Sequence, residues 1–241
     1  RSSLFLGLSD GARTDLFRRA NEGVITHEQV LQTHEIKPER INKLLEKLLK
    51  DVRNISPEIK ETAHVKFRTL VLLDDFSGSG TSYLRIGENG ELEGKLLELF
   101  NDISDQSRPM AELVDIADVH VMLVLYIATQ QALEHLTMLS GSILDPKTIP
   151  FEIIAVHPLN HDIRIGPGDS LEAFLTENYR ADELEDEHTK KGGGGIKFGY
   201  GNCGLPVVLS HNTPNNSIYP LWARTSVLRA LFPRVIRHKK S

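Results

Sequence analysis

Two neighbouring acids at the end of an apolar run carry the clearest chemistry in this sequence. Asp74 and Asp75 follow the run 71–73, and after Phe76 comes a loop of small residues. These loop residues are Ser77, Gly78, Ser79, Gly80 and Thr81. Glycines let the backbone turn so tightly that several amides can converge on phosphate oxygens, and the hydroxyls add donors. The two carboxylates can bind ribose hydroxyls and share a hard cation such as Mg²⁺. The pattern therefore predicts a sugar-phosphate site with Asp74 and Asp75 as catalytic residues.

Two other phosphate-binding loops do not fit these residues. A Walker A loop needs a lysine before its Ser or Thr to reach the terminal phosphates, and no lysine lies near Gly80. A dinucleotide-binding fingerprint needs a third glycine, which is absent after Gly78 and Gly80. An ordinary loop whose acids cap the next helix stays an alternative, although a helix cap needs only one acid.

A second loop with anion-binding character lies near the start of the chain. Residues 3–8 are expected to form a buried strand, and residues 15–21 a helix. Between them lie the candidate ligand-binding residues Ser9, Asp10 and Gly11, followed by Arg13. Because Gly11 frees the backbone and Arg13 can clamp phosphate oxygens, the segment predicts a second anion site with a catalytic arginine. The alternative is an ordinary strand-to-helix turn with a surface arginine.

Polar side chains also gather after the last expected strand, residues 205–210. They are His211, Asn212, Asn215 and Asn216, and the only tryptophan, Trp222, follows them. Buried amides are costly to leave without hydrogen bonds, so they are expected to bond either a tight turn or a ligand. Asn side chains can bind the edge of a base and Trp222 can stack on its face, which predicts a base-recognition pocket. A turn, with simple packing of Trp222, is the alternative.

Apolar strands that alternate with helices predict an α/β fold. Strands are expected at residues 64–74, 118–126 and 151–157, and helices at residues 92–103 and 130–139. This alternation predicts a parallel sheet with helices on both faces and with the functional loops at the carboxyl ends of its strands.

The residues that follow the first loop are expected to form an inserted helical hairpin, residues 24–60. Thr26 and Gln29 have the spacing of a capping box, and Pro38 suits the first turn of a second helix. A helix–turn–helix DNA reader has similar spacing. Direct DNA binding is not favoured, because the second helix mixes lysines with acids. The polar residues 104–112 are expected to form a loop.

The composition suits a single domain over residues 1–241. The chain is 40% hydrophobic and has a net charge of −5, which does not indicate a global field for nucleic acid or for membranes. Cys203 is the only cysteine, and no apolar run approaches the ~20 residues of a membrane span, so we expect a cytoplasmic protein. An acidic run and four consecutive glycines predict a mobile loop or a linker at residues 182–195.

The run 71–81 resembles the signature with which type I phosphoribosyltransferases bind 5-phosphoribosyl 1-pyrophosphate (PRPP). The segment 7–14 is similar to a variant of their pyrophosphate loop. Together with residues 202–204 and 211–216, these segments resemble a bacterial family of phosphoribosyltransferase-like proteins associated with conflict systems, including retron antiphage operons. The resemblance implies binding of PRPP or a related nucleotide with Mg²⁺. It also implies a role in phage defence, with a reverse transcriptase and non-coding nucleic acid as partners.

These residues leave three functions open. In a transferase, Asp74 and Asp75 hold the ribose, the loop 77–81 binds the 5′-phosphate, and Arg13 stabilises the departing pyrophosphate. The second hypothesis is a non-catalytic nucleotide sensor that controls a partner, because no standard base-binding hood is recognisable. The third is a nucleotide N-glycosidic hydrolase in which residues 211–216 orient a water molecule.

Overall fold

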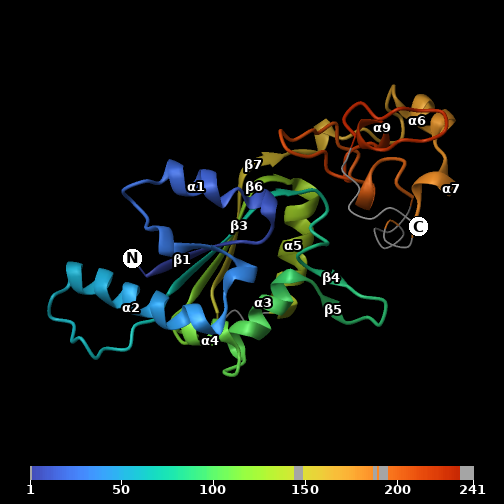
Figure 1. The fold of residues 1–241 in the computed structure, drawn as a ribbon. Coiled ribbons are helices and arrows are strands. Elements are labelled where there is room, and N and C mark those ends of the chain that lie inside the picture. The colour runs from blue at the N-terminus through green and yellow to red at the C-terminus, as the bar shows by residue number, and fades with distance from the viewer. Residues whose placement is uncertain (1, 144–148, 187–188, 190–194, 234–241) are drawn as a thin grey trace. The chain divides into compact units, whose positions relative to one another are not determined.

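The computed structural model describes residues 2–143, 149–186, 189 and 195–233 (Figure 1). These residues group into two compact units. The first comprises the described parts of Arg1–Ser77, Ser82–Ala128 and Leu133–His157, and the second those of Gly78–Thr81, Thr129–Ala132 and Pro158–Ser241. The expectation of a single domain over residues 1–241 stays a prediction beside this grouping.

A five-stranded parallel sheet forms the centre of the first unit. Its strands, in spatial order, are β2 (Val30–Gln32), β1 (Ser3–Gly7), β3 (Thr69–Ser77), β6 (His120–Thr129) and β7 (Phe151–Leu159). The strands of the pairs β1–β2, β1–β3 and β3–β6 run parallel. The predicted parallel α/β fold is therefore confirmed. Strand β3 begins at Thr69, later than expected, and runs past both acids to Ser77.

Helices connect these strands, and further short helices lie in the second unit. They are α1 (Thr14–Ala20), α2 (Pro38–Ile55), α3 (Lys95–Ser104), α4 (Pro109–Leu113), α5 (Gln130–Ile143), α6 (Glu172–Asn178), α7 (Ala181–Leu184) and α9 (Tyr219–Trp222). Short 3-10 turns are η1 (Asp10–Ala12), η2 (His27–Gln29), η3 (Thr33–Glu35), η4 (His161–Ile163) and η5 (Tyr200–Asn202). The strands β4 (Arg85–Ile86) and β5 (Leu92–Glu93) pair as an antiparallel hairpin before α3. None of the described helices has the length and apolar character needed to cross a bilayer.

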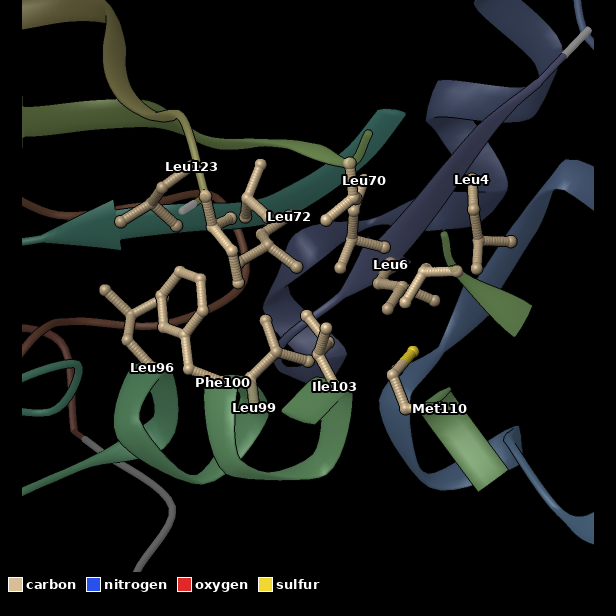
Figure 2. Close-up of a cluster of buried hydrophobic side chains, with 14 of the residues drawn as sticks. Leu4, Leu6, Leu70, Leu72, Leu96, Leu99, Phe100, Ile103, Met110 and Leu123 are labelled. Atoms are coloured by element: carbon tan, nitrogen blue, oxygen red, sulfur yellow. The ribbon is translucent and has the colours of Figure 1, made fainter. Parts of the chain in front are cut away.

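Alternating side chains divide the sheet between two apolar clusters. Leucines of β1, β3 and β6 point toward α3, whose Leu96, Leu99, Phe100 and Ile103 meet them (Figure 2). The intervening residues Val71 and Leu73 pack with Phe5 and Phe17, so α1 lies on the opposite face. This period of two is what a pleated strand imposes on a buried sheet. Burying each leucine contributes about 1.5–3 kcal/mol, so the α3 layer holds the ends of β1 and β3 firmly in place.

The segment 24–60 differs from the expected helical hairpin. The capping box of Thr26 and Gln29 is present, but it opens only the single turn η2. The chain then extends as β2, because Val30 and Leu31 are buried at the edge of the sheet beside β1. One long helix, α2, follows from Pro38. The expected loop at residues 104–112 also differs, because α4 begins at Pro109.

The expected strand at residues 205–210 does not form. Leu205 alone makes a parallel bridge, to Ser217. Pro206 has no N–H to donate to a strand partner, and the carbonyl of Val207 accepts instead from the Ser217 hydroxyl at 2.7 Å. In the expected mobile loop 182–195, α7 covers the first residues, whereas residues 187–188 and 190–194 lie outside the described residues.

Candidate functional site

Asp74 is a buried carboxylate in the first unit, held by side chains from three segments. Only 3% of its surface is exposed. Its Oδ1 accepts a hydrogen bond from the Ser9 hydroxyl at 2.5 Å, and its Oδ2 accepts one from the Tyr83 hydroxyl at 2.8 Å. The ammonium of Lys95 lies 3.7 Å from Oδ2. Asp74 thus fixes the loop after β1 to the centre of the sheet.

The electrostatics of this cluster follow from its burial. Burial raises the pKa of Asp74 above its ordinary value, and the hydrogen bond from Ser9 and the charge of Lys95 oppose that rise. Burial also raises the pKa of Tyr83 well above its ordinary value, and the negative charge of Asp74 adds to the effect. Tyr83 therefore keeps its proton and acts as a hydrogen-bond donor to Asp74.

Asp75 occupies a different environment from its neighbour. Its side chain is only partly buried and lies against the backbone of Gly11. A Cβ placed on Gly11 would stand 2.5 Å from Asp75 Oδ2, so only glycine allows this approach. Within the described residues, no group of three or more His, Cys, Asp or Glu side chains is arranged to hold a metal ion. An ion beside Asp75 would need further oxygen ligands from a bound phosphate compound.

The loop after β1 has the strand–turn–helix form that the sequence predicts. Asp10 and Gly11 lie in η1, and Arg13, between η1 and α1, has left-handed backbone angles (φ 46°, ψ 47°) that are unusual for a residue other than glycine. The hydroxyl of Tyr126, a residue of β6, donates a hydrogen bond to Ala12 O at 2.9 Å. Arg13 is partly exposed, and its Nε lies 3.6 Å from Asp15 Oδ1. Its guanidinium is thus in the first unit, on the helix side of this loop.

Gln32, the last residue of β2, supports this loop, and the sequence did not reveal that role. Oriented to satisfy its surroundings, its amide donates to Gly7 O at 2.9 Å and to Ser9 O at 3.3 Å, and accepts from Thr14 Oγ1 at 3.1 Å. One side chain of β2 thus braces both ends of the loop. A single glutamine outside the loop carries no signal that it supports the loop until the β1–β2 pairing is known.

The residues Gly78–Thr81 belong to the second unit. Gly80 has a left-handed φ of 78°, which makes the tight turn that the sequence predicts. The hydroxyls of Ser79 and Thr81 lie 2.8 Å apart and share a hydrogen bond. Thr129 donates to Gly78 O at 2.5 Å and accepts from Ala132 N, so it ties the loop to the start of α5. Ser77, just before the loop in the first unit, has a buried hydroxyl without a hydrogen-bond partner among the described residues.

Asn216 is the C-terminal candidate that reaches this loop. A Cβ on Gly78 would lie 2.3 Å from Asn216 Cγ, so the two residues touch. The Asn216 amide donates to Tyr200 O at 3.0 Å and to Cys203 Sγ at 3.4 Å. Asn216 therefore contacts the loop through Gly78 and is itself held by hydrogen bonds within the second unit.

A second glycine-rich segment, residues 199–204, packs on the loop. Gly199, Gly201 and Gly204 all have positive φ. A Cβ on Gly201 would lie 2.8 Å from Ser79 Cβ, and Gln131 donates to Gly201 O at 2.8 Å. Three glycines within six residues were a visible signal for this support, whereas Thr129 and Gln131 had none.

The other C-terminal candidates are not gathered around one point. His211 and Asn212 are exposed in a turn where the backbones of Leu209 and Asn212 bond each other. The Asn215 carbonyl accepts from Tyr200 N at 2.7 Å. Trp222 packs against an apolar cluster, and its Nε1 donates to Ser217 O at 2.9 Å. The predicted base-recognition role of these residues stays a prediction.

Comparison with known protein families matches the sequence of this chain to a family model. The PRTase-CE family model matches residues 29–234, which includes the acids and the loop 78–81 but not the loop that contains Arg13. Searches of curated proteins and of solved structures gave no match. With a match over most of its length, the chain belongs to the PRTase-CE family and is a phosphoribosyltransferase-like protein.

Proposed function

We propose that this protein binds PRPP or a closely related nucleotide and, when active, transfers its phosphoribosyl group. The observation that carries the proposal is the contrast between the two acids of β3. Asp74 is buried and hydrogen-bonded, whereas Asp75 is partly exposed and lies against a glycine of the loop after β1. A pair of this kind gives one carboxylate to position the loop and one to bind a ligand.

Asp75 is the residue proposed to bind the ribose. Its carboxylate can accept hydrogen bonds from the 2′- and 3′-hydroxyls, as an ionised acid has only acceptor sites. Asp74 keeps little capacity for a ligand, because both of its oxygens already accept hydrogen bonds from Ser9 and Tyr83. Its role in the reaction is to position the loop through Ser9.

The two phosphate groups of PRPP are assigned to the two loops. The 5′-phosphate is proposed to bind Ser77 and the residues Gly78–Thr81, which follow the acids directly in the chain. The diphosphate is proposed to bind the amides around Ser9, Asp10 and Gly11 and the guanidinium of Arg13. Backbone amides and a planar guanidinium are suited to phosphate oxygens.

Mg²⁺ fits this donor set only together with the ligand. Asp75 is a partly exposed carboxylate, and Mg²⁺ in proteins commonly takes one or two carboxylates together with substrate phosphates and waters. When bound, the ion would neutralise charge on the diphosphate. Asp74, enclosed by hydroxyl donors, is proposed to act on the ion only through its charge.

The proposed reaction is a displacement at C1 of the ribose. A nitrogen nucleophile forms a bond to C1, the bond from C1 to the diphosphate oxygen breaks, and the nucleophile loses its proton to solvent. Arg13 and the loop amides bind the leaving diphosphate, whose negative charge grows as the bond breaks. Asp75 fixes the ribose and stabilises the positive charge that develops near C1. The gain in rate comes from positioning and from electrostatics.

Calorimetric titration with PRPP tests this proposal. We expect saturable binding that tightens with Mg²⁺ and weakens at least about tenfold in Asp75→Asn, which retains the size of the side chain. Asp102→Asn is the matched control, because Asp102 is a partly exposed acid of α3, like Asp75, and pairs with Arg108. Equal PRPP affinity of the wild-type protein and Asp75→Asn would contradict the proposal.

A specific observation favours a nucleotide sensor as the second candidate. The Asn216 amide, which was expected to bind the edge of a base, donates to the carbonyl of Tyr200. Trp222, which was expected to stack on a base, packs against an apolar cluster of the second unit. A protein of this kind would bind the nucleotide and control a partner without transfer to a base. Pyrophosphate release with any base in a panel would support transfer over the sensor. Release of free base from a nucleotide, without pyrophosphate, would indicate the hydrolase.

The resemblance to conflict-associated proteins extends the proposal to phage defence. We propose an effector or accessory role there, in concert with partner proteins and nucleic acid. Plaque assays on cells that carry the chain with its neighbouring genes test this role. Protection that is lost in Asp75→Asn and kept in Asp102→Asn is expected, and full protection by Asp75→Asn would contradict a role for this site.

A further inference from the structure

Lys95 is a charged residue of the acid site that no sequence pattern marks. It is the first residue of α3, and its Nζ donates to Leu8 O at 3.2 Å. The same Nζ lies 3.7 Å from Asp74 Oδ2 and 5.6 Å from the centre of the Tyr83 ring. The side chain remains 40% exposed. The Lys95 ammonium is thus held at Leu8, where the loop after β1 begins, and the Lys95 side chain is partly open to solvent.

The backbone fixes Lys95 in this position. Gly94, just before it, has a φ of 129°, and a Cβ there would lie 2.3 Å from Tyr83 O. Leu96 N donates to that same carbonyl at 3.1 Å. Because the Tyr83 hydroxyl also holds Asp74, one residue sets both the start of α3 and the orientation of the buried acid. Lys95 and Asp74 are therefore placed by the same anchor.

The contacts of Lys95 leave hydrogen-bonding capacity for a ligand. An ammonium carries three N–H donors, and one is directed at Leu8 O. The 3.7 Å separation from Asp74 is an ion-pair distance, too long for a hydrogen bond, and the oxygens of Asp74 already accept from Ser9 and Tyr83. The helix dipole disfavours a positive charge in a first turn, so Lys95 lies where an added anion would be favourable.

We propose that Lys95 binds the diphosphate group of the ligand, an assignment that rests on the proposed function and adds a residue to it. A diphosphate brings several negative charges next to Asp74 and Asp75, and Coulomb repulsion opposes its binding unless fixed cations compensate. Lys95 supplies such a charge at Leu8, where the loop begins, and Arg13 supplies one where the loop ends. The two cations bracket the amides of Ser9–Gly11.

Titration with two partial ligands tests the assignment. Inorganic pyrophosphate carries the diphosphate alone, and ribose 5-phosphate carries the sugar and the 5′-phosphate without it. We expect Lys95→Met to weaken pyrophosphate and PRPP binding at least about tenfold and to leave ribose 5-phosphate affinity within about twofold. Lys95→Arg should restore most of the pyrophosphate affinity. Lys66→Met is the control, because Lys66 also donates to a backbone carbonyl, that of Ala111.

The outcomes separate this assignment from the proposed function. PRPP binding by the wild-type protein that Lys95→Met leaves unchanged would overturn only the assignment of Lys95. Equal weakening of ribose 5-phosphate and pyrophosphate would also overturn it, since it would indicate a general structural role. Failure of the wild-type protein to bind PRPP would overturn both. If thermal unfolding shows that Lys95→Met is not folded, Lys95→Gln replaces it. Glutamine also removes the positive charge but keeps a polar group at the end of the side chain.

Discussion

The acid site of the first unit and the loop of the second unit are built by different means. Around Asp74, side chains make the structure: two hydroxyls and an ammonium surround one buried carboxylate. Around Gly78–Thr81, the backbone makes it, through glycines with positive φ and close packing on Asn216 and Gly201. The first arrangement depends on charge and protonation, whereas the second depends on the absence of a Cβ. Substitutions should therefore damage the two regions in different ways.

Loss of the buried carboxylate is expected to have the largest effect on stability. Asp74→Ala leaves the Ser9 and Tyr83 hydroxyls without their acceptor, which should cost about 3 kcal/mol in the free energy of unfolding. Asp75→Asn, by contrast, should cost less than about 1 kcal/mol because its side chain is partly exposed. Urea unfolding of both variants measures this difference. Equal losses would contradict the division of roles between the two acids.

Added methyl groups should separate the two loops. In Gly78→Ala the new Cβ meets Asn216 Cβ and Cγ, which are held by hydrogen bonds, so about 2 kcal/mol of stability should be lost. In Gly11→Ala the new Cβ meets the end of the Asp75 side chain, which can rotate away at lower cost. Thermal unfolding and PRPP titration of both variants check this. Gly11→Ala should chiefly weaken binding, and a larger loss of stability in Gly11→Ala than in Gly78→Ala would contradict the comparison.

Thr129 should show a smaller effect confined to the second loop. Thr129→Val keeps the shape of the side chain but removes its hydrogen bonds with Gly78 O and Ala132 N. We expect a loss of about 1–2 kcal/mol in the free energy of unfolding. Ribose 5-phosphate affinity should fall while pyrophosphate affinity is unchanged, as calorimetric titration would measure. A fall in pyrophosphate affinity alone would contradict the assignment of the 5′-phosphate to the loop that Thr129 supports.

The smallest predicted effect is a pH dependence at the acid site, which has no counterpart at residues 78–81 because these residues carry no carboxylate. Because burial raises the pKa of Asp74 in the folded protein, the folded state binds this proton more tightly than the unfolded state. The extra stability that protonation of Asp74 supplies is therefore full below its ordinary value of 3.8 and is lost as pH rises through the raised pKa. Relative to Asp74→Asn, the wild-type protein should gain stability as the pH falls from 7 toward that range. Denaturant unfolding across this range measures the difference, and a gain with rising pH would have the wrong sign.

The sequence predicted those parts of the fold and site that depend on residues close together in the chain. The run 71–73, the acids and the small-residue loop gave β3 and the tight turn at Gly80, since apolar runs and glycines act locally. The strand expected at residues 205–210 was wrong because Pro206 and the Ser217 hydroxyl interrupt its pairing. Tertiary contacts decided that segment.

The supporting residues of the site could not be predicted from local patterns. Gln32, Lys95 and Thr129 reach the loops only because β2, α3 and β6 pack where they do. The expected hairpin at residues 24–60 failed for a related reason. A capping box predicts a helix start, but Val30 and Leu31 pair with β1 and are buried there, so tertiary contacts override the local preference.

Phosphorus NMR of PRPP titrated with the protein tests the central claim most directly, because the 5′-phosphate and the diphosphate give separate signals. The account predicts that both signals shift or broaden with the wild-type protein. It predicts that Gly78→Ala chiefly weakens the response of the 5′-phosphate, whereas Lys95→Met chiefly weakens that of the diphosphate. PRPP signals that remain unchanged at saturating concentrations of the folded wild-type protein would contradict the account.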